Sequence, residues 1–197
     1  PTTDQHPFFF FVLQGILIRL AGIGEFVLRY PSVMAATLLV PVVWVLTRYF
    51  ERRQVLPAQS ARWAAGFAAL HPFFLWYGQE ARPYALWALL SLWAIYLLFR
   101  STDGRSDGQF NRGWLAGYVL VTLMALTTHY YAPFWLPLHA IYLYTYLRHR
   151  RRWLGPAVAI GLILLAGAIG GAVAWQILRQ GGGGNFPDVS LAILIPD

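Results

Sequence analysis

Long apolar stretches alternate with short polar connections along this chain. A helix needs about 20 apolar residues, within a range of roughly 17–25, to cross the hydrocarbon core of a bilayer. Five stretches lack any charged residue: 30–47, 63–79, 83–99, 113–147 and 153–178. Four of these stretches match the length of one crossing, so each predicts one membrane-spanning helix.

The stretch 113–147 is too long for a single crossing, since it holds 35 residues. Its middle carries the polar sequence HYYAP at 129–133, which ends in a proline, and proline interrupts a helix. We therefore expect two helices joined by a tight turn. Residues 8–23 are also apolar but shorter, and they contain Arg19, which favours a helix lying in the membrane interface.

The predicted fold is therefore an all-α, polytopic membrane protein with about six spanning helices and an N-terminal interfacial helix. Composition agrees, because 58% of the residues are hydrophobic and only 12% are charged, against about 25% charged in soluble domains. Residues 1–197 form one predicted helical membrane domain. The chain opens at Pro1 and stops just after an apolar run, so we expect it to be part of a longer protein.

Charge and cysteine content exclude several classes of function. The chain has no cysteine, which rules out disulfides, thiol nucleophiles and thiolate metal sites. The net charge of +7 would indicate nucleic acid only if the basic residues shared one face of a soluble domain. Instead, eleven of the 15 arginines fall in three connections, at 48–62, 100–112 and 148–152, so we expect no nucleic-acid partner.

These arginine-rich connections also set the predicted orientation, because basic loops stay on the cytoplasmic side. The alternate connections then face the exterior. They contain the polar residues at 4–7, 78–82 and 129–131, and the glycine run at 181–184. The sequence therefore predicts a site on the extracytoplasmic face.

The segment HPFFLWYGQEARPYALW, residues 71–87, places one acid and one base in a short turn between two apolar stretches. Ionisable residues at a membrane edge are costly and tend to be paired or functional. In one interpretation Glu80 and Arg82 are interfacial anchors flanked by belt aromatics. In the other, Arg82 binds a phosphate or pyrophosphate oxygen, while Glu80 and Gln79 bind hydroxyls or hold Arg82 in position.

Two further segments leave the same choice open. Asp4 and His6 precede the first apolar helix, where they would cap its exposed amides or act on substrate, Asp4 on a proton and His6 on a phosphate. His129 is either a satisfied turn histidine or a site residue. No metal-ligand spacing and no phosphate-cradling glycine motif occur in the sequence, so no metal site is predicted.

The order of these motifs resembles the bacterial relatives of dolichyl-phosphate-mannose protein mannosyltransferases and aminoarabinose transferases, which are membrane glycosyltransferases of the C-type fold. The resemblance covers roughly residues 1–150. The family pattern D-x-H-P-P matches Asp4, His6 and Pro7, with Phe8 in place of the second proline. The pattern Y-S-Q-E-A-R-x-Y matches residues 77–84 with Gly78 in place of serine, and T-H-Y matches residues 128–130.

The resemblance implies transfer of a sugar from a polyprenyl-phosphate carrier to a lipid, protein or glycan acceptor, outside the inner membrane and with inversion. The usual base in this family is an Asp of an Asp-Glu pair that precedes the D-x-H-P-P pattern. Asp4 is the catalytic candidate within this chain. No cofactor is implied, and the use of a divalent metal stays open. The implied substrate-binding residues are His6, Tyr77, Gln79, Glu80, Arg82, Tyr84, His129 and Tyr130.

Physical chemistry supports this interpretation, since a phosphate leaving group needs positive charge and the acceptor needs a carboxylate base. Aromatic rings near the turns offer stacking surfaces for a sugar, namely Trp76, Tyr77, Tyr84, Tyr130, Tyr131 and Trp135. A transporter or flippase-like subunit for a lipid-linked or small anionic substrate is the alternative, although no internal repeat of the kind that transporters show is evident. A noncatalytic membrane subunit is a third hypothesis.

Overall fold

The computed structural model describes residues 8–103 and 110–147, together with a few positions between 161 and 168. Four expectations fall outside the described residues: the roles of Asp4 and His6, the span at 153–178, the basic connection at 148–152 and the glycine run at 181–184.

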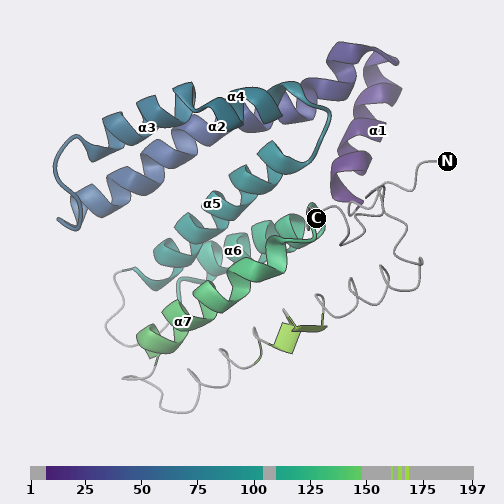
Figure 1. The fold of residues 1–197 in the computed structure, drawn as a ribbon. Coiled ribbons are helices and arrows are strands. Elements are labelled where there is room, and N and C mark those ends of the chain that lie inside the picture. Colours follow the sequence, from purple (N-terminus) through teal and green to yellow (C-terminus); the bar gives the residue numbers. More distant parts are fainter. Residues whose placement is uncertain (1–7, 104–109, 148–160, 162–163, 166, 169–197) are drawn as a thin grey trace, which may run out of the picture.

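Within the described residues the chain is helical, and no strand occurs among them (Figure 1). α2 lies alongside α3 and α4, and α5 packs against both α2 and α6. The elements are α1 (Phe9–Ala21), α2 (Glu25–Arg52), α3 (Ser60–Leu70), α4 (Pro72–Gln79), α5 (Tyr84–Thr102), α6 (Arg112–Leu126), the 3-10 helix η1 (Ala132–Trp135) and α7 (Leu136–Leu147).

Two of these helices, α2 and α5, are long and apolar enough to cross a membrane. The six predicted spans are not confirmed, since the other described helices are shorter. α2 extends beyond the predicted 30–47 at both ends, where the ion pairs Glu25–Arg29 and Arg48–Glu51, each 2.5 Å long, lie within its terminal turns. At about 1.5 Å per residue, its 28 residues measure about 42 Å.

The predicted single helix at 63–79 is wrong, because α3 ends at Leu70 and α4 begins at Pro72. Proline has no backbone N–H to continue the helix, and His71 takes an extended conformation before it. The His71 Nδ1 atom accepts a hydrogen bond from the Phe73 N–H at 3.2 Å. His71 therefore caps α4 and does not bond to a neighbouring helix, as an apolar-run histidine was expected to do.

The predicted pair of helices within 113–147 is confirmed as α6 and α7, with the turn and η1 between them. His139 on α7 lies 3.0 Å from the Tyr118 hydroxyl on α6, which is the helix–helix bond expected for this residue. The predicted helix at 8–23 is α1, which ends where Gly22 adopts a φ of +80°.

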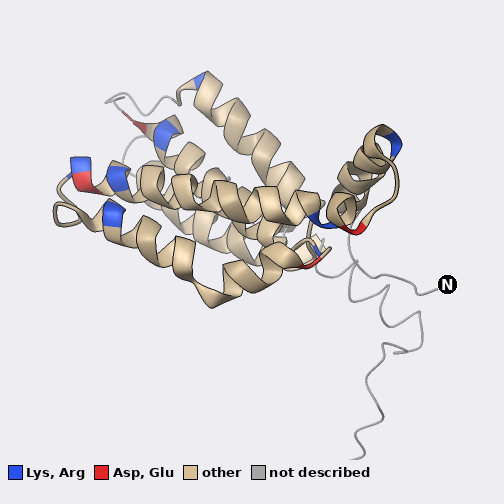
Figure 2. Cartoon of the chain, turned by 90° about the horizontal axis from the view of Figure 1, so that it is seen from above, with Lys and Arg blue, Asp and Glu red and all other residues tan. Residues whose placement is uncertain are grey.

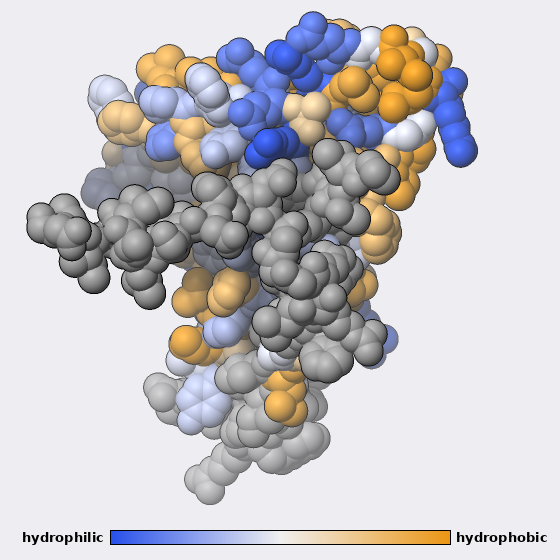
Figure 3. All heavy atoms as spheres, turned by 45° about the vertical axis from the view of Figure 1, so that its right-hand side comes forward, coloured by the Kyte–Doolittle hydropathy of each residue, from blue (hydrophilic) through white to orange (hydrophobic). Residues whose placement is uncertain are grey.

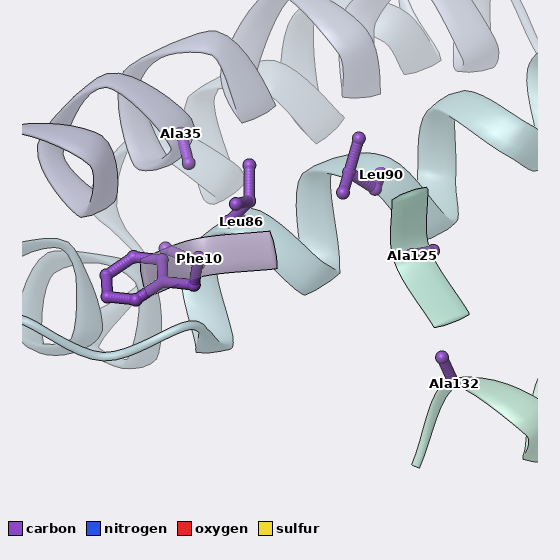
Figure 4. Packing of buried hydrophobic residues seen from close by; sticks show 7 residues of the cluster. Phe10, Ala35, Leu86, Leu90, Ala125 and Ala132 are labelled. Carbon is purple, nitrogen blue, oxygen red and sulfur yellow. The ribbon is translucent and has the colours of Figure 1, made fainter. Parts of the chain in front are cut away.

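The main apolar cluster gathers residues that are far apart in the sequence (Figure 4). Phe10 from α1 lies among residues of α2, α5, α6 and η1, namely Ala35, Ala85, Leu86, Leu90, Ala125 and Ala132. The Phe9 N–H also donates to the Thr127 carbonyl oxygen at 3.0 Å. These contacts fix the start of α1 beside the turn that follows α6.

Charged residues are concentrated toward the two ends of the long helices, and an uncharged middle separates them (Figure 2). At one end, Arg53 pairs with Asp103. At the other end, Ser32 bonds to Arg82. Twenty residues of α2 separate Ser32 from Arg52, which corresponds to about 30 Å. The charged ends of the bundle are thus about one hydrocarbon thickness apart.

The sides of the bundle expose large apolar side chains. Trp63, Phe67 and Leu70 form a stripe along α3 with 68%, 72% and 76% of their surfaces exposed. Figure 3 shows hydrophobic side chains beside hydrophilic ones over the upper part of one face. Such contiguous apolar surface is uncommon in soluble monomers and is expected for helices in lipid.

Candidate active site

The turn at residues 80–83 joins α4 to α5, and its backbone is anchored on α2. Ser32 Oγ donates a hydrogen bond to the Arg82 carbonyl oxygen at 2.9 Å. Ser32 is fully buried, and so is Pro83, which immediately precedes α5. A buried hydroxyl on a spanning helix and a fixed proline φ together hold this turn in one place.

Gly78 allows α4 to approach α2 closely at the same end of the bundle. A Cβ atom at this position would lie 2.8 Å from the Cβ atom of Ala36. Atoms do not approach so closely without one backbone moving. The glycine that replaces the serine of the resembled pattern is therefore matched to its partner helix in this chain.

The side chains of the turn face outward, unlike its backbone. Arg82 and Glu80 have 60% and 34% of their side-chain surfaces exposed, and Arg82 Nε lies 3.9 Å from Glu80 Oε2. A pair this long and exposed contributes little to stability. Glu80 Oε1 also accepts a hydrogen bond from Trp76 Nε1 at 2.8 Å. The carboxylate is thus held from α4, while the guanidinium stays accessible.

Gln79 hydrogen-bonds within its own helix. Its Nε2 atom donates to the Leu75 carbonyl oxygen at 3.1 Å. The side chain is exposed at the end of α4, beside the turn. Its expected role in binding hydroxyls or holding Arg82 stays a prediction.

Rings from three elements form a continuous row behind the turn, which we call the aromatic row and define as Tyr77, Tyr84, His129 and Trp87. The Tyr77 and Tyr84 centroids are 4.7 Å apart, and those of Tyr84 and His129 are 5.3 Å apart. Trp87 stacks on His129 with a centroid distance of 5.0 Å. Three predicted site residues, Tyr77, Tyr84 and His129, are thereby brought into contact.

His129 is almost completely buried, with 3% of its surface exposed. Its Nδ1 atom accepts a hydrogen bond from the Tyr131 N–H at 3.1 Å, so a neutral ring would carry its proton on Nε2. The preceding Thr128 is also buried, and its hydroxyl donates to the Met124 carbonyl oxygen at 2.6 Å. Tyr130 is half-buried in the same turn.

Trp135 lies away from the site that the sequence suggested for it. It lines a small interior cavity between α5, α6 and α7 together with Ser91, Thr122 and His139. As part of η1 it follows the turn by several residues, which directs it toward the interior. A sugar-stacking role for Trp135 is therefore not proposed further.

Sequence reasoning missed the part played by Ser32. Ser32 and Thr37 are both hydroxyl residues in the apolar stretch 30–47, and nothing in the sequence distinguishes them. Only the fold shows that Ser32 reaches another helix, whereas Thr37 donates to the Val33 carbonyl oxygen of its own helix at 2.8 Å. Trp87 was expected to be a belt aromatic and instead supports His129.

The arrangement can bind an anion with Arg82 and accept a proton or hydrogen bond at Glu80, next to aromatic surfaces. Within the described residues, no group of three His, Asp or Glu side chains is placed to hold a metal ion.

The comparisons with known proteins bear on residues 5–175. Over this range the chain matches the family model described as dolichyl-phosphate-mannose-protein mannosyltransferase. The chain belongs to this family. The match includes the turn, the aromatic row and the helices that anchor them, so the protein is a membrane glycosyltransferase relative. Neither a curated protein nor a solved structure matches the chain.

Proposed function

We propose that this protein transfers a sugar from a polyprenyl-phosphate-linked donor to an acceptor on the extracytoplasmic face of the inner membrane. Two observations support the proposal. The family match covers the turn at residues 80–83, and this turn lies at the opposite end of α2 from Arg48, Arg52 and Arg53. Basic residues are retained on the cytoplasmic side, which puts the turn on the exterior.

Arg82 binds the phosphate of the donor in this proposal. The observation that carries the assignment is the contrast between its buried, hydrogen-bonded backbone and its exposed guanidinium. A guanidinium matches two phosphate oxygens with parallel hydrogen bonds. Because its backbone is already fixed, Arg82 is positioned for the negative charge that develops on the leaving phosphate.

The reaction is a displacement with inversion at the anomeric carbon. The acceptor oxygen forms a bond to that carbon, the bond to the phosphate oxygen breaks, and the phosphate leaves with the electron pair. A carboxylate takes the proton of the acceptor hydroxyl. Asp4 is the candidate for this role within the chain. Glu80 is held by Trp76 beside Arg82, where it positions the guanidinium or binds a hydroxyl.

The aromatic row and its neighbours complete the proposed site. Tyr77 and Tyr84 are half-buried, so part of each ring is available to a sugar face. Burial of His129 between Tyr84 and Trp87 favours a positioning role for this residue. His6, Gln79 and Tyr130 stay proposed contacts to the sugar or phosphate.

Replacement of Arg82 tests the proposal. In the full-length protein, Arg82→Ala is expected to lower sugar transfer from a polyprenyl-phosphate donor by about 100-fold or more, the typical effect of removing one charge-stabilising donor. Arg82→Lys is expected to restore part of the activity. Arg29→Ala is the matched control, since Arg29 is an arginine near the same end of α2, paired with Glu25.

Two results would contradict the proposal. The phosphate assignment fails if Arg82→Ala retains wild-type transfer. If Arg29→Ala loses as much activity as Arg82→Ala, general loss of surface charge explains the effect and Arg82 has no specific role.

A further inference from the structure

A second basic site lies at the end of the bundle away from the turn. A cavity of about 300 Å³ opens between the last turns of α2 and α5, a size at the lower limit of small-molecule pockets. Its walls combine cationic and aromatic side chains with one acid: Trp44, Val45, Arg48, Tyr49, Arg52, Arg53, Tyr96, Arg100 and Asp103. We call this the arginine cavity.

Carboxylates compensate only part of the positive charge at this cavity. Arg53 forms an ion pair with Asp103, and Arg100 Nε lies 3.8 Å from the same carboxylate. Arg48 pairs with Glu51 at 2.5 Å. In the described part of the chain no acidic side chain lies within ion-pair distance of Arg52. Four guanidiniums thus face two carboxylates, which leaves an excess of positive charge.

The walls of the cavity are held in place before any ligand binds. The Tyr49 hydroxyl donates to Asp103 Oδ1 at 2.7 Å. The Arg53 guanidinium lies 4.8 Å from the Tyr49 ring centroid, and that of Arg100 lies 4.8 Å from the Trp114 centroid. Such cation–π contacts restrict the side chains. The entropic cost of ordering these groups around an anion is thereby reduced.

The position of the cavity relates it to the membrane surface. Trp44 lines it and has 42% of its surface exposed. Trp44 lies eight residues before Arg52 on α2, or about 12 Å deeper along the helix. Exposed tryptophan on a spanning helix marks the boundary between hydrocarbon and headgroups. The cavity therefore has a cationic end at headgroup level and an apolar end toward the acyl chains.

We propose that the arginine cavity binds the phosphodiester headgroup of an anionic glycerophospholipid, such as phosphatidylglycerol. Basic pockets between membrane helices on the cytoplasmic side recognise such headgroups. The excess charge selects an anion, and Arg52 supplies a guanidinium that is not engaged by a carboxylate. Trp44 and Val45 extend the site along the acyl chains, which a free phosphate lacks. The proposal does not rest on the proposed sugar transfer.

Native mass spectrometry of the purified full chain tests the proposal. Dioleoylphosphatidylglycerol and dioleoylphosphatidylcholine are added separately, and binding of the first is expected to be stronger. Arg52→Gln is expected to weaken phosphatidylglycerol binding about fivefold, the contribution of one basic residue near an anionic headgroup. Arg112→Gln is the matched control. Arg112 is an exposed arginine at the start of α6 and does not line the cavity.

Three results would overturn the proposal. The first is equal binding of the two lipids by the wild-type protein. The second is equal weakening by Arg52→Gln and Arg112→Gln, which would indicate diffuse surface attraction. The third is full displacement of the lipid by inorganic phosphate, with potassium chloride of equal ionic strength as reference, which would indicate a free-phosphate site. Should Arg52→Gln not fold, the wild-type comparison of the two lipids decides.

Discussion

The two charged ends of the bundle hold their arginines in opposite ways. At the arginine cavity the side chains are fixed, as when Arg53 contacts both Asp103 and the Tyr49 ring. At the turn, Arg82 is fixed by its carbonyl oxygen through Ser32, and its guanidinium lies 3.9 Å from the nearest carboxylate oxygen of Glu80.

This difference separates structural arginines from arginines available to a ligand. A guanidinium paired with a carboxylate and a ring stabilises the helix ends and has few donors left. A guanidinium on a fixed backbone keeps its donors for an anion at little cost in backbone order. By this criterion Arg82 and Arg52 belong together, although they lie at opposite ends of the molecule.

Removal of the Ser32 hydroxyl is expected to have the largest effect on transfer among the changes that leave Arg82 itself in place. Ser32→Ala leaves a buried carbonyl oxygen without its partner, which costs about 1–3 kcal/mol. It also frees the turn, so we expect transfer to fall about 10-fold or more through misplacement of Arg82. Assays of sugar transfer and of unfolding in detergent measure the two effects.

Thr37→Ala is the control for this prediction. Thr37 donates only within its own helix and is partly exposed, so its removal is expected to leave transfer unchanged. If both variants behave alike, the Ser32 bond does not position Arg82.

The close contact between α4 and α2 gives a smaller expected effect. Gly78→Ala adds a Cβ atom 2.8 Å from that of Ala36. Overpacking of this kind costs about 1–3 kcal/mol, offset by the roughly 1 kcal/mol that alanine gains over glycine in a helix. We expect a several-fold loss of transfer, because α4 carries Tyr77 and leads into the turn.

The double variant Gly78→Ala with Ala36→Gly separates packing from other causes. It exchanges the two residues across the interface and restores the room for one Cβ atom. Transfer close to the wild-type rate is expected. Failure of the exchange to restore activity would show that the contact with Ala36 is not the reason for the glycine.

The smallest expected effect on transfer is at the end with the arginine cavity. Glu51 Oε1 accepts a hydrogen bond from the Ala61 N–H at 2.7 Å, and Oε2 accepts one from Arg48 at 2.5 Å. Glu51 thereby caps α3, whose own N-cap residue provides no side-chain bond. Glu51→Ala is expected to lower the midpoint of thermal unfolding and to leave transfer unchanged.

Glu25→Ala is the counterpart at the other end of α2. Glu25 forms only the exposed pair with Arg29, and such pairs contribute little. Its removal is expected to leave the unfolding midpoint unchanged. A larger destabilisation by Glu25→Ala than by Glu51→Ala would reverse the contrast between the two ends.

The sequence predicted helices well where a single rule governs them. Charge-free length located α2 and α5, and the HYYAP motif located the turn between α6 and η1. The rule failed at 63–79, because counting charges gives no weight to Pro72 or to a histidine able to cap the next helix.

Site residues were predictable by type but not by environment. Glu80 and Arg82 were evident as ionisable residues in a turn, and the structure adds that the two side chains differ in exposure. His129 was evident as a turn histidine, yet its burial by Trp87 depends on how α5 meets the turn after α6. Ser32 was not evident, since its partner is 50 residues away in the chain.

The break between α3 and α4 has a consequence for how the chain is inserted during synthesis. The two helices have 11 and 8 residues, about 17 and 12 Å, so neither crosses a bilayer by itself. Both pack along α2, which precedes them in the chain. α2 would therefore enter the lipid first and act as a template on which the two half-length helices partition together.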